Sequence, residues 1–297
     1  MPKPFRSRWA WLGALLWLLS SQPSAACTLW GAAGESVEGG GTLIAKNRDW
    51  TPDHRQELLI LRPAAGYRSL TLKAVEGSEP GIKAGVNEKG LVIVSAAASQ
   101  VPAAERRKFR QRKELMAHFL TTCASVAEVL KKVHLLRRPV FYLVGDRKEL
   151  ALIEVAPDGR RSIKNQDSGT LHHANHYCAV DAPDIKPNPG RSSLQRYNRM
   201  GELLQNPHKS YALEDFIRFS QDRTAGPDNS IWRTGSSPTR GRTLATWIVS
   251  VPASGSPRLY LKTANPGEPE QLCRMSVEEA FRIGDRDRIP LDCELCR

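Results

Sequence analysis

The chain has 297 residues and a formal net charge of +12, with 43 Lys and Arg against 31 Asp and Glu. This length suffices for one large hydrophobic core or two modest ones, and such a charge favours contact with acidic surfaces or substrates. The densest basic cluster, at 105–113, has no nucleic-acid-binding motif beside it. We therefore expect a solvated charged loop or helix face there and no nucleic-acid partner.

The first element in the chain is a predicted secretory signal peptide at 1–26. A basic head precedes an apolar run at 9–19, and small residues at 24–26 fit a cleavage site. The apolar run is short for a bilayer span, so we expect no permanent membrane span and predict export to the periplasm or beyond the cell. Cleavage after Ala26 removes three basic residues from the total of +12, which leaves the mature domain at 27–297 with a charge of +9.

The mature part then alternates predicted hairpins with predicted helices. Patterns of Ser followed three residues later by Glu or Gln predict helices that begin near Ser125, Ser192 and Ser276. Because hairpins rather than single strands alternate with helices, we expect antiparallel sheets with helices on their outer faces, in a single domain. The strands are predicted, in chain order, at 27–33, 42–47, 58–61, 69–73, 82–94 (a hairpin), 140–144, 150–155, 244–251 and 258–262.

Cleavage after Ala26 would make Cys27 the first residue of the mature protein. An α-amino group titrates near pH 7.7–8.0, so a neutral amine beside the thiol can take its proton and later pass it to a leaving amine. Cys27 would then combine a nucleophile and its general base in one residue. Two other readings stay open at this point, namely a structural or disulfide-bonded cysteine and a cysteine lipidated after signal cleavage.

All six cysteines lie in the predicted mature part, where an oxidising compartment permits disulfides. The pair Cys293 and Cys296 forms a lone C-x-x-C at the end of the chain, which is a weak zinc signal. A disulfide that staples this tail to Cys273 is the better interpretation. The sequence leaves the connectivity of Cys123, Cys178, Cys273, Cys293 and Cys296 open.

Several separated segments, taken together, resemble one enzyme family. They occur in a fixed order and span nearly all of 27–270: Cys27-Thr28, Lys46-Asn47-Arg48-Asp49-Trp50, the hairpin 85–91, Ala174-Asn175-His176-Tyr177, 192–196, 226–233 and 242–246. The set is similar to the linear amide C–N hydrolases of the N-terminal-nucleophile superfamily. These include choloylglycine hydrolases, penicillin V acylases and isopenicillin N acyltransferase-like proteins. The resemblance implies an α+β fold, an αββα sandwich of two antiparallel sheets between helical layers.

The resemblance also implies a role for each of four catalytic candidates. Cys27 matches the nucleophile, and Asp49 matches the aspartate that holds the N-terminal amine. Asn175 matches an asparagine whose side-chain N–H stabilises the oxyanion. Arg196 matches an arginine beside the nucleophile, whose fixed charge would favour the thiolate.

Three further residues are assigned to substrate binding: Lys46, Trp50 and Ala97. Lys46 stands where bile-salt hydrolases carry arginine, and Ala97 stands where they carry a second oxyanion asparagine, for which a backbone N–H in 96–98 could substitute. Both departures move the chain toward the acyltransferase-like branch. Trp50 belongs to a group of aromatic residues that could line an acyl pocket or fill the core, the others being Trp30, Tyr142 and Trp232.

The histidines His172, His173 and His176 raise the question of a metal site. We expect no metal and no cofactor, because the resembled family needs none and no carboxylate or cysteine follows at a convincing ligand spacing.

The predicted function is hydrolysis of a linear non-peptide amide in a small N-acyl compound, through a thioester on Cys27. Acyl transfer is the alternative within the family, and a non-catalytic exported lipoprotein or binding protein is the alternative outside it. The N-acyl substrate and the assembly of copies into a homo-oligomer stay open.

Overall fold

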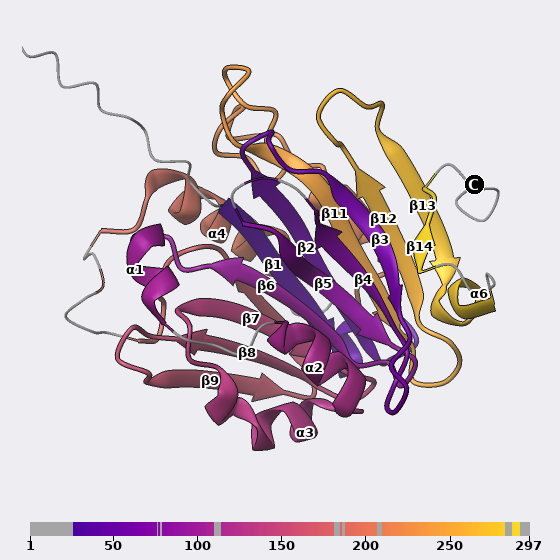
Figure 1. Ribbon diagram of the computed structural model, residues 1–297. Helices are drawn as coiled ribbons and strands as arrows, with labels where there is room; N and C mark the ends of the chain where they lie inside the picture. The colour runs from indigo at the N-terminus through magenta and orange to yellow at the C-terminus, as the bar shows by residue number, and fades with distance from the viewer. Residues whose placement is uncertain are drawn as a thin grey trace, which may run out of the picture.

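The computed structural model describes residues 26–75, 77, 79–109, 114–180, 185, 188–206, 210–282 and 287–291. Within these residues, two antiparallel sheets pack face to face (Figure 1). One sheet has the strand order β10-β1-β2-β11-β12-β13, and the other has the order β14-β3-β4-β5-β6-β7-β8-β9. The predicted signal peptide up to residue 25 and the tail cysteines at 293 and 296 lie outside the described residues.

The strand bounds show which hairpins build each sheet. The smaller sheet contains β1 (Ala26–Ala33), β2 (Thr42–Trp50), β10 (Gly169–His173), β11 (Arg242–Val251), β12 (Arg258–Thr263) and β13 (Gln271–Ser276). The larger sheet contains β3 (Gln56–Leu61), β4 (Ser69–Ala74), β5 (Gly81–Asn87), β6 (Val92–Ala97), β7 (Val140–Gly145), β8 (Leu150–Val155), β9 (Arg161–Gln166) and β14 (Arg288–Ile289).

Helices cover the outer face of each sheet. Their bounds are α1 (Ala103–Lys108), α2 (Leu115–Thr122), α3 (Val126–Lys131), α4 (Arg191–Leu203), α5 (Leu213–Ser220) and α6 (Val277–Arg282). Short 3₁₀ turns lie at Gly34–Ser36 and Val133–Leu135. Apolar residues of α2 and α3 form one core with β7 and β8, and those of α4 and α5 form another with β1 and β2. A third core fills the space between the sheets, so the expected αββα sandwich is confirmed.

Alternation along β1 shows how the sequence produces these layers. Successive side chains of a strand point to opposite faces. Leu29 packs between the sheets, and its neighbour Trp30 packs outward among residues of α4 and α5. Cys27 has the same parity as Leu29 and therefore belongs to the core between the sheets. Trp30 is a core residue and not part of a substrate pocket.

The predicted strands are all present, whereas β9, β10, β13 and β14 were not predicted. Each of these four lies at the edge of its sheet. An edge strand with one exposed face needs few apolar residues, and β9 is polar along most of its length. The alternation signal is therefore weak where a strand has only one neighbour.

Two of the three predicted helix caps are confirmed. Ser125 Oγ accepts a hydrogen bond from Glu128 N, and Ser276 exchanges two hydrogen bonds with Glu279. The cap at Ser192 is wrong, because α4 begins at Arg191 and its N-cap residue has no side-chain hydrogen bond. Ser192 Oγ instead donates to Asp228 O.

Three cysteines of the described chain carry free thiols: Cys27, Cys123 and Cys178. Cys273 forms a disulfide bond, and its partner lies outside the described residues. No helix among the described residues is both long and apolar enough to cross a bilayer.

Candidate active site

Pairing of β1 with β2 positions Cys27. In the antiparallel register Ala26 lies opposite Asp49 and Cys27 lies opposite Arg48. Cys27 is 4% exposed and lines a pocket of about 610 Å³. The strands predicted at 27–33 and 42–47 are therefore neighbours in one sheet, which places Cys27 beside 46–50.

Asn175 and Arg196 converge on the backbone of Cys27. Cys27 N donates to Asn175 Oδ1 at 2.7 Å, and Arg196 donates to the same oxygen at 2.9 Å. Arg196 also donates to Cys27 O at 2.6 Å and to Thr28 Oγ1 at 3.0 Å. Because the Asn175 oxygen accepts from two donors, its amide nitrogen must point the other way, and it donates to Ala97 O at 2.9 Å. Cys27 thus forms one hydrogen-bonded group with two residues that lie 148 and 169 positions further along the chain.

Asp49 lies on the opposite face of β2 from Arg48 and is completely buried. Thr243 donates to its Oδ1 at 2.8 Å, and Arg233 is 4.0 Å from its Oδ2. Oδ2 accepts no hydrogen bond. Burial raises the pKa of this carboxyl, and the charges of Arg233 and Arg196 oppose that shift. A buried carboxylate oxygen across from Ala26 is therefore left without a donor.

The three residues assigned to substrate binding all line the Cys27 pocket, namely Lys46, Trp50 and Ala97. Lys46 Nζ donates to the carbonyl oxygens of Lys83, at 2.9 Å, and Ser95. Burial lowers the pKa of Lys46 to about 8. Lys46 is thus a cation fixed on the pocket wall.

Arg48 is a site residue that sequence reasoning missed. Its guanidinium lies 4.4 Å from the centre of the Trp50 ring, and one of its nitrogens is 3.0 Å from His54 Nδ1. Burial lowers the pKa of Arg48, and attraction and hydrogen bonding to Cys27 oppose this shift. The signal was available, because a residue opposite Cys27 in the predicted hairpin must share its face.

One part of the pocket wall is apolar. It is formed by side chains from β5, β7, α2 and the segment after α1: Ile82, Phe109, Leu115, Met116, Val140 and Tyr142. Tyr142 therefore lines the pocket, whereas Trp232 is 3% exposed and is not among its lining residues.

The basic cluster at 105–113 needs a correction at one residue. Arg106 was expected on a solvated face, but it is 4% exposed and lines the pocket. Its guanidinium donates to the carbonyl oxygens of Ala98 and Val101. Residues Glu105, Arg107 and Lys108 of α1 are exposed as expected.

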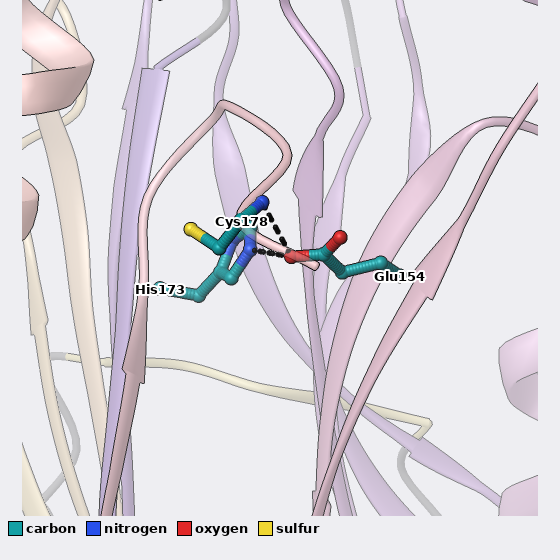
Figure 2. Close-up of side chains that lie close together, drawn as sticks. All are labelled: Glu154, His173 and Cys178. Carbon is teal, nitrogen blue, oxygen red and sulfur yellow. Dashed lines mark hydrogen bonds and ion pairs between the residues drawn. The ribbon is translucent and has the colours of Figure 1, made fainter. Parts of the chain in front are cut away.

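A second polar cluster supports the loop that carries Asn175, and Figure 2 shows it. The reasoning that no carboxylate or cysteine accompanies the histidines was wrong, because the ligand atoms of Glu154, His173 and Cys178 lie within 4.8 Å of one another. Glu154 accepts from His173 Nε2 at 2.9 Å and from the backbone N–H groups of Cys178, Ala179 and Val180.

This cluster has the geometry of a loop anchor. Burial lowers the pKa of His173, but hydrogen bonds and charges from Cys178 and Glu154 outweigh burial and raise it to about 9. The imidazolium can donate to both Glu154 and Ala174 O. The Cys178 side chain points away from Glu154 (Figure 2). Protein N–H groups already fill the Glu154 carboxylate, and two protein oxygen atoms already accept from the His173 ring, so the cluster fits a structural ion pair better than a metal site.

Comparisons with known proteins agree with this architecture. Residues 36–267 match the family described as acyl-coenzyme A:6-aminopenicillanic acid acyl-transferase. No curated protein sequence matches the chain.

Solved structures of a mutant and of a variant of conjugated bile acid hydrolase from Clostridium perfringens share the fold. Both are 12% identical to this chain, with TM-scores of 0.55 and 0.52. Each alignment covers 90% of this chain and 94% of the other. The chain therefore belongs to the acyl-coenzyme A:6-aminopenicillanic acid acyl-transferase family, a group of N-terminal-nucleophile enzymes that shares its fold with the bile acid hydrolases.

Proposed function

We propose that this chain is the precursor of an exported cysteine hydrolase that cleaves the linear amide of an N-acyl compound. The observation that carries the proposal is the placement of Cys27. Its side chain faces a pocket of about 610 Å³, while its backbone nitrogen is held 2.7 Å from Asn175 Oδ1. Signal cleavage after Ala26 would turn that nitrogen into the α-amino group on which the chemistry depends.

The surroundings of Ala26 and Cys27 suit such an amine. Asn175 Oδ1 accepts an N–H from Cys27 before cleavage and can accept one afterwards. Asp49 Oδ2 is buried without a donor, and a new ammonium group nearby would supply one. Asp49 would thus orient the amine, as the resemblance implied.

The reaction would proceed through a thioester. The neutral α-amine takes the thiol proton, and the Cys27 sulfur attacks the amide carbonyl carbon. The resulting oxyanion receives a hydrogen bond from Asn175 Nδ2, which gives one of its two protons to Ala97 O and keeps the other. The C–N bond breaks as the ammonium passes its proton to the leaving amine. Water then attacks the thioester, with the α-amine again acting as base, and releases the acid and the thiol.

Acyl transfer to an amine is the second candidate, because the matched family is described by that reaction. An exported enzyme meets abundant water and little acyl-coenzyme A, so we favour hydrolysis. The partition of the acyl-enzyme between water and an added amine separates the two. Predominant amide formation at millimolar amine would favour the transferase.

The test is the N-terminus of the exported protein, read by intact mass and terminal sequencing. A free amine on Cys27 should accompany amidase activity, and Cys27→Ser should retain the fold and lose at least about 10³-fold in kcat. Cys178→Ser, a change at a free thiol outside the pocket, is the matched control and should keep its activity. A diacylglyceryl group on Cys27, or cleavage elsewhere, would contradict the proposal and favour a lipoprotein or binding protein.

A further inference from the structure

The pocket around Cys27 carries an excess of positive charge. Its lining includes six basic side chains and two acidic ones: Lys46, Arg48, Lys73, Lys83, Arg106 and Arg138, against Glu79 and Glu114. Glu79 is shared among three arginines at 3.5–3.9 Å, namely Arg106, Arg107 and Arg138. Glu114 is exposed.

Three of these cations have no carboxylate partner among the described residues. Lys46 donates only to backbone carbonyl oxygens, and Lys83 Nζ donates to Pro80 O at 3.5 Å. Arg48 is 2% exposed, and its Nε makes no hydrogen bond. Lys46 and Arg48 are buried and Lys83 is half-buried, and charges removed from water are normally paired because desolvation penalises an isolated ion. A cluster of cations without a carboxylate partner is therefore suited to bind an anionic group of a ligand.

The three side chains lie together. Lys46 Nζ bonds to the backbone oxygen of Lys83, and Arg48 follows Lys46 on the same face of β2. Burial lowers the pKa of Lys83 to about 7, and repulsion from Arg48 and Lys46 adds to this shift. All three side chains line the same pocket, and a bound anion would relieve their mutual repulsion.

We infer that Lys46, Arg48 and Lys83 form a subsite for a carboxylate next to the scissile amide. This inference rests on the proposed function. Arg48 lies opposite Cys27 in the register of β1 and β2, and the same pocket also has an apolar wall from α2 and β7. The acyl group then packs on the apolar wall, and the carboxylate belongs to the amine half. The preferred substrates are N-acylated amino acids rather than neutral N-acyl amines or lactones.

The first test needs no substrate. Alkylation of Cys27 by iodoacetate, an anion, is compared with alkylation by neutral iodoacetamide at pH 6.5, read at the Cys27 peptide by mass spectrometry. The ratio of the two rates, referred to that of glutathione, should be raised by about tenfold or more, since a nearby cation is worth more than 1 kcal/mol in a partly buried site. Both reagents need the same thiolate, so the ratio isolates the charge of the subsite.

Variants at Lys83 make the test specific. Lys83→Met should lower the ratio several-fold, and Lys83→Arg should restore it. Lys131→Met is the matched control, because it removes the same charge from an exposed position on α3. An unchanged ratio in Lys83→Met, or an equal loss in Lys131→Met, would overturn the subsite.

The second test uses N-decanoyl-L-phenylalanine, its neutral carboxamide and a decanedioic acid monoamide of phenethylamine. The first should be cleaved with a kcat/KM about 10–100-fold above the second, as expected for a hydrogen bond to a charged group. Lys83→Met should remove that difference through KM. Equal cleavage of the acid and the carboxamide would overturn the subsite but would not contradict the Cys27 mechanism. Preferential cleavage of the monoamide would overturn the assignment of the carboxylate to the amine half of the substrate. Absence of all cleavage by a protein with a free Cys27 amine would contradict the proposed function, and the alkylation ratio would still decide the subsite.

Discussion

Arg196 is the residue whose contacts are hardest to replace. Its planar guanidinium donates at once to Cys27 O, Thr28 Oγ1 and Asn175 Oδ1, and it is 1% exposed. Lysine has one nitrogen on a flexible stem and cannot reproduce such a fork. Arg196 therefore sets the distance between the nucleophile and the asparagine proposed to stabilise the oxyanion.

We predict that Arg196→Lys lowers kcat by about 10²-fold, because a small displacement of reacting groups has effects of that size. The KM should change much less. Arg191→Lys, at an exposed position in the first turn of the same helix, is the control. Full activity in Arg196→Lys would show that the bridge does not position Asn175.

Lys83 predicts a pH effect on stability. Its pKa is lowered to about 7 from the ordinary value of 10.5, so between these values the unfolded chain binds more protons, and stability rises with pH. The charged and titratable groups around it are Arg48, Lys46, Glu79 and Cys27. Lys83→Met should raise the melting temperature at pH 6 and have little effect at pH 10. A wild-type advantage at pH 6 would contradict this prediction.

Individual site residues differ in how far the sequence could predict them. Cys27, Asn175 and Arg196 were predicted through resemblance, and the structure brings them together. Arg48 was missed because the run 46–49 contains four polar residues, which usually ends a strand. Here β2 is buried on both faces through Trp50, so polarity signals a site instead of a turn.

At the scale of elements, the loop after β10 links the two polar clusters. Its start carries Asn175, and its later backbone N–H groups are held by Glu154 of β8, a strand of the other sheet. No sequence pattern could predict this contact, since Glu154 and His173 are joined only by the packing of two sheets. The segment 174–180 of this loop is thus held both at Asn175 and at 178–180.

Replacement of Glu154 should loosen the loop after β10. Glu154→Gln is predicted to cost about 1–3 kcal/mol, the range for leaving buried donors unsatisfied. Backbone amides at 178–180 should exchange faster with solvent, and kcat should fall. Glu38→Gln, at an exposed position, is the control. Unchanged hydrogen exchange in Glu154→Gln would show that other contacts hold the loop.

The ion pair of Glu154 and His173 also predicts a pH dependence of stability. The pKa of His173 is raised to about 9 from 6.5, so its contribution to stability is fully present below pH 6.5 and is lost as the pH rises through 9. The destabilisation by Glu154→Gln should therefore be larger at pH 6 than at pH 9.5, as measured by urea unfolding. A constant difference between the two pH values would mean that His173 is not charged in the folded protein.

At the scale of the whole molecule, close contact between the two sheets defines the sandwich. Gly145 of β7 faces β2, and a Cβ placed there would lie 2.7 Å from Ile44 Cδ1 and 2.8 Å from Leu150 Cδ2. A larger residue would push the sheets apart or force side chains from their rotamers. The layer order was predictable from hairpins and helices, whereas the few points of closest approach depend on three-dimensional packing.

Gly145→Ala is predicted to destabilise the protein by about 1–3 kcal/mol, the usual cost of overpacking. Gly190→Ala, where a Cβ meets nothing within 4 Å, is the control. Combination with Ile44→Ala, which removes the contacting carbons, should be less destabilising than the sum of the two changes. If the destabilisations by Gly145→Ala and Ile44→Ala simply add in thermal unfolding, the contact between these two positions is not the source of the strain.

The buried position of Ala26 constrains the order of signal cleavage and folding under the proposed function. Ala26 and Cys27 are 1% and 4% exposed, and both belong to a strand paired on β2. A peptidase must bind its target as an accessible extended segment, so the bond between these residues can be cut only before β1 joins its sheet. Copies that fold before processing would keep a blocked amine permanently. Under the proposed function, a precursor that folds before cleavage lacks the free α-amino group of Cys27 and is inactive. The order of folding and cleavage would then prevent hydrolysis inside the producing cell.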